Sequence, residues 1–281
     1  MKIAKIRDGG EVRWVEIAQD RLRPMTDADV TAVLCRSTHS VDLPVDADRA
    51  LDLLGKASLE PPCREGAALF CVGLNYKDHV DEVARDMPAN PAVFLRLQRS
   101  IVGHGSPLAM PSGSLEYDFE GEIAVVIGRP GRHIREEDAW NHVGGFTVFM
   151  DGSARDVQRQ SLTAGKNFHA SGSCGPWIVT PDELADVTSI ALRTTVSGQE
   201  VQRSSTDKLI YSIPQIVRFL STVSELHTGD VIATGTPAGV GLSRKPPLWL
   251  KPGDVVEVCV EGIGALRNDV GGDHANEGGM Q

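Results

Sequence analysis

The part of the chain after residue 62 consists of short apolar runs with β-type spacing, separated by Gly, Pro and Asp. Residues 229–233 and 253–258 each begin with a Gly-Asp pair and continue as a predicted strand. The segment 251–253, Lys-Pro-Gly, has the Pro-Gly order of a type II turn. Helical patterns are few and do not alternate regularly with the strands, which argues against a doubly wound parallel sheet. The pattern predicts an α+β chain that is mainly β, with a largely antiparallel rolled or sandwiched core.

Residues 1–62 have a different pattern, which predicts a small N-terminal α/β domain. Residues 1–17 alternate apolar and polar side chains around an Asp-Gly-Gly turn, as a β-hairpin does. Two short helical patterns follow, at residues 27–36 and 46–54. This segment is therefore expected to carry its own hairpin and helices.

The boundary of this segment is set by Pro61 and Pro62, which interrupt the chain before a new apolar strand at residues 67–72. We predict a main domain over residues 63–281. Its Gly-rich end, residues 271–281, is expected to be a mobile tail.

Two helix starts are predicted within the main domain. At the first, Thr180 can cap the helix, Pro181 can occupy the first turn, and Glu183 can complete a capping box. The second predicted helix covers residues 212–220.

Composition excludes several classes of protein. The formal net charge of -10 argues against a nucleic-acid-binding protein, because such proteins usually carry an excess of positive charge. The five cysteines are odd in number, scattered and without a Cys-x-x-Cys pair, which argues against a disulfide framework and a zinc ribbon. No apolar run is long enough to span a membrane, and the N-terminus lacks a signal core. A reducing cytoplasm is the expected compartment.

Three acidic residues form a candidate metal site. Glu120 and Glu122 are two apart in the predicted strand 115–127, so both lie on one face, roughly 7 Å apart between Cα atoms. Asp151 follows a second apolar run, residues 145–150. Like charges on one face repel unless a cation lies between them, and Mg2+ needs few protein ligands. The alternative, an ordinary solvated strand face, stays open on these residues alone.

His79 and Glu82 form a candidate general base. They lie in residues 75–82, which read as a loop leading into a short helix, where positions three apart share a face. A carboxylate beside an imidazole fixes its tautomer and raises its basicity. An incidental pair on a surface helix is the commoner local explanation.

Small residues surround Lys166 in the segment 165–177, which suits close approach of the backbone to an anionic ligand. His169 and Cys174 lie in the same segment and suggest a nucleophile. That interpretation is not favoured, because no base is tied to Cys174 and a buried, inert cysteine is commoner.

A Gly-rich loop follows a predicted strand in residues 233–241. It is not a Walker loop, because it lacks the Gly-Lys-Ser/Thr ending. Its backbone amides and the Thr236 hydroxyl could hold a carboxylate. A plain connecting turn explains the pattern equally well.

Five motifs follow one another in residues 68–268. They are Asn75-Tyr76-x-x-His79-x-x-Glu82, Glu120-Gly-Glu122-Ile-Ala-Val-Val-Ile-Gly, Asp151-x-Ser-Ala-Arg155-Asp156, Gly165-Lys166-Asn-Phe and Thr234-Gly-Thr236-Pro-Ala-Gly-Val-Gly. In this order they resemble the fumarylacetoacetate hydrolase family. The resemblance implies a mixed β-roll with a small, variable N-terminal domain, in a protein that is usually a homodimer.

The resemblance also implies a role for each motif. By this comparison Glu120, Glu122 and Asp151 match the Mg2+ or Mn2+ ligands, and His79 and Glu82 match the dyad that activates water. Lys166 matches the lysine near the reacting carbonyl, and Thr236 matches a residue that holds the substrate carboxylate. Tyr76 and Arg155 are expected to contact the substrate.

The activity implied is metal-dependent hydrolysis of a carbon–carbon bond in a small 2,4-dioxo acid of the acylpyruvate type, through an enolate held by the metal. Oxaloacetate-type decarboxylation and keto–enol or double-bond isomerisation are alternatives on the same site. A non-catalytic β-domain that binds a carboxylate is a more remote one.

The chain departs from the family pattern at one place. Where the family commonly has Phe-x-Lys-Pro, this chain has Phe-Leu-Arg-Leu in residues 94–97. Arg96 keeps the positive charge of the lysine but changes the geometry of the donor.

Overall fold

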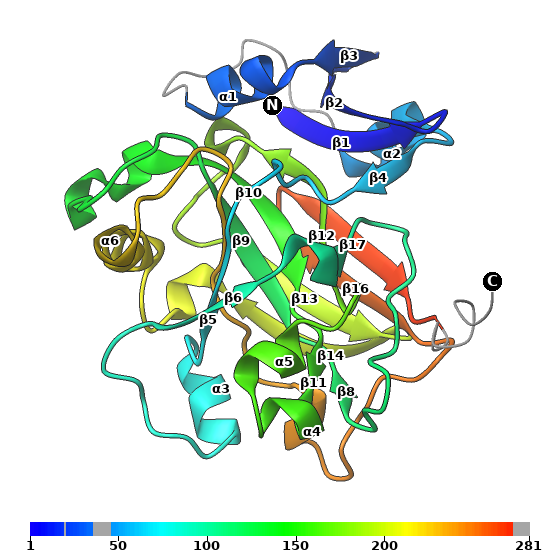
Figure 1. Ribbon diagram of the computed structural model, residues 1–281, viewed down its shortest axis with the longest axis vertical. Coiled ribbons are helices and arrows are strands. Elements are labelled where there is room, and N and C mark those ends of the chain that lie inside the picture. Colours follow the sequence, from blue (N-terminus) through cyan, green and yellow to red (C-terminus); the bar gives the residue numbers. More distant parts are fainter. Residues whose placement is uncertain (20, 36–45, 272–281) are drawn as a thin grey trace, which may run out of the picture.

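The computed structural model describes residues 1–19, 21–35 and 46–271. Its strands form a large mixed sheet, a smaller antiparallel sheet and one short separate pair (Figure 1). The predicted fold class, mainly β with mixed sheets, is confirmed. The expected tail, residues 272–281, and the end of the first predicted helix lie outside the described residues.

The large sheet has eleven strands. Along its main path the order is β3-β2-β1-β12-β10-β9-β15-β5-β6, while β4 pairs with β1 and β7 with β12. Only the pairs β15–β5 and β12–β7 are parallel among these. The strands are β1 (Lys2–Asp8), β2 (Glu11–Ile17), β3 (Leu22–Met25), β4 (Ser58–Glu60), β5 (Leu69–Gly73), β6 (Ala92–Arg96), β7 (Ile101–Val102), β9 (Gly121–Ile127), β10 (Val143–Met150), β12 (Gly172–Val179) and β15 (Val231–Ala233).

The smaller sheet is antiparallel and has the order β14-β13-β16-β17. Its strands are β13 (Ala191–Val196), β14 (Gln199–Ser205), β16 (Val255–Val260) and β17 (Gly264–Asp269), and a separate short pair joins β8 (Tyr117–Asp118) to β11 (Ser153–Ala154). The α-helices are α1 (Asp27–Leu34), α2 (Ala47–Leu54), α3 (Lys77–Glu82), α4 (Arg155–Gln158), α5 (Leu162–Lys166) and α6 (Ile213–Val223); short 3-10 helices are η1 (Gln98–Ser100), η2 (Glu136–His142), η3 (Pro181–Glu183), η4 (Thr206–Lys208) and η5 (Gly241–Ser243).

The N-terminal elements form a layer at one end of the molecule (Figure 1). The predicted hairpin is present as β1 and β2, and the two predicted helices are present as α1 and α2. β1 pairs with β12 through Lys2 opposite Val179 and Ile3 opposite Ile178. The N-terminal strands therefore extend the large sheet. The domain boundary at residue 62 stays a prediction.

The prediction of a helix that begins at Thr180 is wrong. Only the 3-10 turn η3 forms there, and the Thr180 side chain does not cap it. Instead, the Thr180 hydroxyl accepts a hydrogen bond from the Met1 amino group at 2.6 Å. Glu183 pairs with that amino group at 2.6 Å and with Lys2 at 2.7 Å. Both members of the expected capping box are thus bonded to the start of the chain.

The helix predicted at residues 212–220 is confirmed as α6. Ser212 accepts a hydrogen bond from the Gln215 backbone, and the Gln215 side chain accepts one from the Ser212 backbone. This reciprocal capping box satisfies two amides that the first helical turn leaves without partners. No helix in the described ranges is long and apolar enough to cross a membrane.

Strands β9 and β10 lie at the centre of the core, and every residue of both is buried. Ile123 and Val125 face one apolar cluster, while Ala124 and Val126 face another. Because both faces are covered, the strands are mostly apolar, as in a sheet with packing on both sides. Polar side chains within them and at their ends, Glu122 among them, are therefore held in buried surroundings.

Candidate active site

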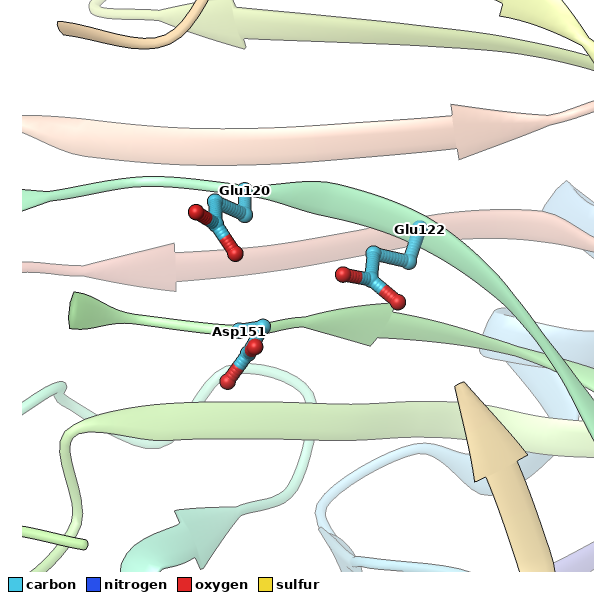
Figure 2. A group of neighbouring side chains, drawn as sticks. All are labelled: Glu120, Glu122 and Asp151. Carbon is cyan, nitrogen blue, oxygen red and sulfur yellow. The ribbon is translucent and has the colours of Figure 1, made fainter. Parts of the chain in front are cut away.

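Glu120, Glu122 and Asp151 come together where β9 begins and β10 ends (Figure 2). The antiparallel register places Phe149 opposite Glu122, and the Asp151 amide donates to the Glu120 carbonyl oxygen at 2.8 Å. One oxygen from each carboxylate lies within 4.8 Å of the others. All three side chains are buried. The fold thus brings the three predicted ligands, here called the acid trio, to one point.

Three buried cations surround the acid trio. Lys166 Nζ lies 2.5 Å from Glu120 Oε2 and 2.6 Å from Asp151 Oδ2. Arg155 Nη2 lies 2.5 Å from Glu120 Oε1, and Arg96 Nη1 lies 2.5 Å from Asp151 Oδ1. Short contacts between charged groups in a dry environment are strong and directional. Two of the acids are therefore each held by two cations.

Glu122 is placed differently. Its Oε2 accepts from the Gly235 amide at 2.8 Å, and within the described ranges it forms no ion pair. Burial, followed by repulsion from Asp151 and Glu120, raises the pKa of Glu122 well above its usual range. For Glu120, burial also acts to raise the pKa, but Arg155 and Lys166 outweigh it and hold the pKa well below its usual range.

This electrostatic arrangement fits a hard divalent cation. Three converging carboxylates are a ligand set that suits Mg2+ or Mn2+ and leaves positions for water or substrate oxygens. The unpaired, buried carboxyl of Glu122 would gain the positive partner that it lacks. The residues present therefore fit the metal that the sequence predicted.

Metal affinity is expected to weaken as the pH falls through the raised pKa of Glu122, in a range above the ordinary value of 4.5. Below that pKa the carboxyl carries a proton, and a divalent ion must release this proton to bind. Calorimetric titration with Mn2+ in buffers of different ionisation enthalpy measures the release. Binding without proton release at every pH tested would contradict the expectation.

His79 lies on α3 with Glu82 one turn later. His79 Nδ1 is 2.8 Å from Glu82 Oε1. Glu82 Oε2 accepts from the Gly239 amide at 2.9 Å and from the Ser243 hydroxyl at 2.6 Å. Burial would raise the pKa of Glu82, but the hydrogen bonds from His79 and Ser243 lower it. The Glu82 carboxylate thus favours the tautomer with the proton on Nδ1 and leaves Nε2 as the nitrogen that can act as a base.

A cavity of about 540 Å3 connects the base and the acid trio. This volume suits a small organic ligand. Its walls include most of the predicted site residues: His79, Glu120, Glu122, Asp151, Arg155, Lys166 and Thr236. They also include residues without a predicted role, among them Arg85, Phe94, Gln158, Arg159 and Leu162.

Two predicted site residues do not line this cavity. Glu82 lies behind His79 and acts on it through the hydrogen bond. Tyr76 is fully buried within the apolar core, and its hydroxyl has no hydrogen-bond partner in the described part of the chain. The structure therefore places Tyr76 under the site rather than on its surface.

Thr236 lines the cavity, but its hydroxyl is already engaged. It donates to the Gly121 carbonyl oxygen at 3.0 Å and accepts from Gln202 Nε2 at 2.7 Å. Gln202 Oε1 also accepts from the Gly121 amide at 2.9 Å. Gln202 thus links Thr236 to the backbone between the two glutamates of the acid trio. Nothing in the sequence pattern signals this residue.

Arg96, noted in the sequence as a departure from the family pattern, is fully buried at its side chain. Besides Asp151, its guanidinium donates to the Gly152 carbonyl at 3.1 Å, to Ser171 Oγ at 3.0 Å, and to Ser100 at Oγ (3.1 Å) and at the carbonyl (3.2 Å). A lysine has its donors on a single atom and cannot reproduce this fork. Arg96 therefore fixes the orientation of Asp151.

Replacing Arg96 with Met is expected to destabilise the fold by about 3–5 kcal/mol, because it leaves the buried Asp151 without one of its charge partners. Arg96→Lys should destabilise the fold less than Arg96→Met, since one hydrogen bond to Asp151 can re-form. Urea denaturation at constant pH measures both. Arg99→Met, at an exposed position, is the matched control. Equal stability of the Arg96→Met and control proteins would contradict the assignment.

Comparison with known proteins identifies the family. The family model described as "Fumarylacetoacetate (FAA) hydrolase C-terminal" matches residues 68–271. The chain belongs to the fumarylacetoacetate hydrolase family, as the five motifs predicted, and is an enzyme of that family.

Two curated relatives are named as tautomerases. "Oxaloacetate tautomerase fahd2, mitochondrial" of Xenopus laevis is 38% identical over 230 residues, which cover 80% of this chain and 72% of the relative. The human "Oxaloacetate tautomerase FAHD2A, mitochondrial" is 36% identical over 250 residues, which cover 88% and 78%.

Solved structures extend the likeness over nearly the whole chain. A fumarylacetoacetate hydrolase from Exiguobacterium antarcticum has a TM-score of 0.80 at 33% identity, covering 97% of this chain and 99% of that one. A 2-hydroxyhepta-2,4-diene-1,7-dioate isomerase from Mycobacterium marinum has a TM-score of 0.77 at 30% identity, covering 98% and 99%. The names of these relatives cover hydrolysis, isomerisation and tautomerisation.

Proposed function

We propose that this protein is a divalent-metal-dependent enzyme that interconverts the keto and enol forms of a small 2-oxo dicarboxylic acid of the oxaloacetate type. The observation that carries the proposal is that His79, hydrogen-bonded to Glu82, lines the same cavity as the acid trio. The names of the tautomerase relatives favour proton transfer over the hydrolysis that the sequence resemblance put first.

The acid trio would hold Mg2+ or Mn2+, and the ion would act as a Lewis acid that makes the protons beside the 2-oxo group more acidic. His79 Nε2 removes a proton from carbon 3 of the keto form. Glu82 stabilises the imidazolium that results, because its carboxylate accepts a hydrogen bond from Nδ1–H. Return of the proton to oxygen gives the enol, and its return to carbon restores the keto form.

The remaining walls suit a substrate with two carboxylates. Lys166 and Arg155 lie beside the acid trio, and Arg85 and Arg159 also line the cavity. Arg159 pairs with Glu116 at 2.7 Å at the exposed edge. Cations beyond the acid trio would attract the second carboxylate of a diacid and would help to exclude neutral oxo compounds.

Hydrolysis of a 2,4-dioxo acid is the second candidate, because the His79–Glu82 dyad would equally deprotonate a water. In that reaction the hydroxide attacks the C4 carbonyl, and the carbon–carbon bond breaks to give a carboxylic acid and the enol of pyruvate. Lys166 would stabilise the negative charge on the attacked carbonyl oxygen.

We also propose that the protein forms a homodimer, in line with the family resemblance. Analytical ultracentrifugation of the purified protein tests this.

A substrate panel separates these functions. Oxaloacetate tautomerisation, pyruvate release from oxaloacetate, and acylpyruvate cleavage are measured on metal-stripped protein with Mg2+, Mn2+ or a chelator added. Faster metal-dependent tautomerisation than cleavage supports the proposal. Acylpyruvate cleavage alone supports the hydrolase, and pyruvate release alone supports a decarboxylase. Carboxylate binding without turnover under any condition supports a non-catalytic β-domain.

A further inference from the structure

The position of Lys166 relative to the acid trio has a second implication. Its Nζ lies between Glu120 Oε2 and Asp151 Oδ2, at 2.5 and 2.6 Å. These are oxygens of two of the three carboxylates that converge within 4.8 Å. The ammonium and a divalent ion would therefore be attracted to the same carboxylates.

We propose that Lys166 is an internal counter-cation that competes with the divalent ion. It holds the carboxylates of Glu120 and Asp151 together before the ion binds. When the ion enters, Lys166 leaves the carboxylates and turns its ammonium into the cavity, toward an anionic substrate. This inference rests on the proposed metal-dependent function.

Charge balance supports competition. The three carboxylates of the acid trio and the three cations around them carry no net charge together when all are ionised, and Asp118, which also pairs with Arg155, adds one buried negative charge. Adding a divalent ion would leave a net positive charge in a buried site, which is unfavourable at low dielectric constant. Moving one cation away from the acid trio reduces this excess, and an anionic substrate in the cavity removes more of it.

Only one of the three cations is free to move in this way. Arg96 is held by four further hydrogen bonds to Gly152, Ser100 and Ser171. Arg155 is held by Asp118 at 2.8 Å and by Gln158 at 3.0 Å.

The hydrogen bonds of Lys166 Nζ within the described residues go to Glu120 and Asp151 alone. The ammonium also lies 5.3 Å from the centre of the Phe94 ring, another residue of the cavity wall. Its side chain can therefore turn by rotation about its own bonds, without breaking another hydrogen bond. The ring face of Phe94 offers a cation a favourable contact beside that path.

Mn2+ titration of metal-stripped protein tests the competition. Lys166→Met is expected to bind Mn2+ roughly tenfold tighter or more, because loss of a neighbouring positive charge favours another cation. Lys166→Arg keeps the charge and should bind no tighter than the unchanged protein. Lys208→Met, which removes an exposed lysine paired with Asp207, is the matched control. Lys166→Gln is a second neutral variant in case Lys166→Met does not fold.

Thermal unfolding gives an independent readout. Without metal, Lys166→Met should unfold at a lower temperature than the unchanged protein, and Mn2+ should raise its unfolding temperature by more. Unchanged or weaker Mn2+ affinity in both neutral variants would overturn the role of Lys166 while leaving the metal site in place. Absence of Mn2+ binding in every protein, including the unchanged one, would overturn the metal-dependent function as well.

Discussion

Replacing His79 with Asn is expected to lower kcat by roughly 100- to 10,000-fold, the usual contribution of a general base. Asn is similar in size but cannot take up a proton, so the cavity is largely preserved while the chemistry is lost. Mn2+ affinity should stay unchanged, because His79 is not one of the acid trio. The steady-state rates on oxaloacetate and on an acylpyruvate, with calorimetry of Mn2+ binding, measure both effects.

The same variant separates the reactions that an enzyme of this family can perform. Tautomerisation and hydrolysis both need the base at His79, whereas decarboxylation needs mainly the metal and can persist. His169→Asn is the matched control, because His169 is exposed and does not line the cavity. Full activity of the His79→Asn protein would remove His79 from the mechanism.

Replacing Asp151 with Asn is expected to weaken Mn2+ binding by roughly 100-fold or more and to abolish turnover. Mutation of a group that only supports a metal ligand already lowers metal affinity by about 10- to 100-fold. Loss of the ligand's own charge should lower the affinity at least as much. Asp151 also neutralises Arg96 and Lys166. Its loss leaves buried positive charge without a partner, which should destabilise the fold by about 3–5 kcal/mol.

Calorimetry with Mn2+ and urea denaturation check the two parts of this prediction separately. Asp186→Asn is the matched control, because Asp186 is exposed and bonds only to neighbouring groups of its own turn. Normal Mn2+ affinity in the Asp151→Asn protein would exclude Asp151 as a ligand. Lost affinity with normal stability would separate its role as a ligand from its role in neutralising Arg96.

The sequence predicted the members of the site better than their arrangement. The three-residue spacing of His79 and Glu82 is a local pattern that a helix turns into a shared face. The strand predicted over residues 115–127 is interrupted at residues 119–120, so Glu120 precedes β9 while Glu122 lies within it, but their carboxylates still converge. The position of Asp151 next to Glu120 depends on the register between β9 and β10. Nothing within either strand encodes that register; the family resemblance supplied it indirectly.

Residues that support the site through distant contacts could not be predicted. Arg96 bonds to Asp151 across 55 positions, and Ser243 bonds to Glu82 across 161. The same limitation explains the wrong helix at Thr180, whose hydroxyl pairs with the Met1 amino group 179 positions away. A capping pattern is reliable only when no distant group competes for the capping side chain, as at Ser212.

The placement of the acid trio on adjacent strands also bears on how the family can diversify. In the sequence, the connection between β9 and β10 lies between Glu122 and Asp151, and it includes η2, which packs against α6. That connection leaves from the end of the strand pair opposite the acid trio. Insertions, deletions or new sequence there can reshape the outer surface without moving a ligand atom. The reaction centre and this outer loop are thus free to evolve independently.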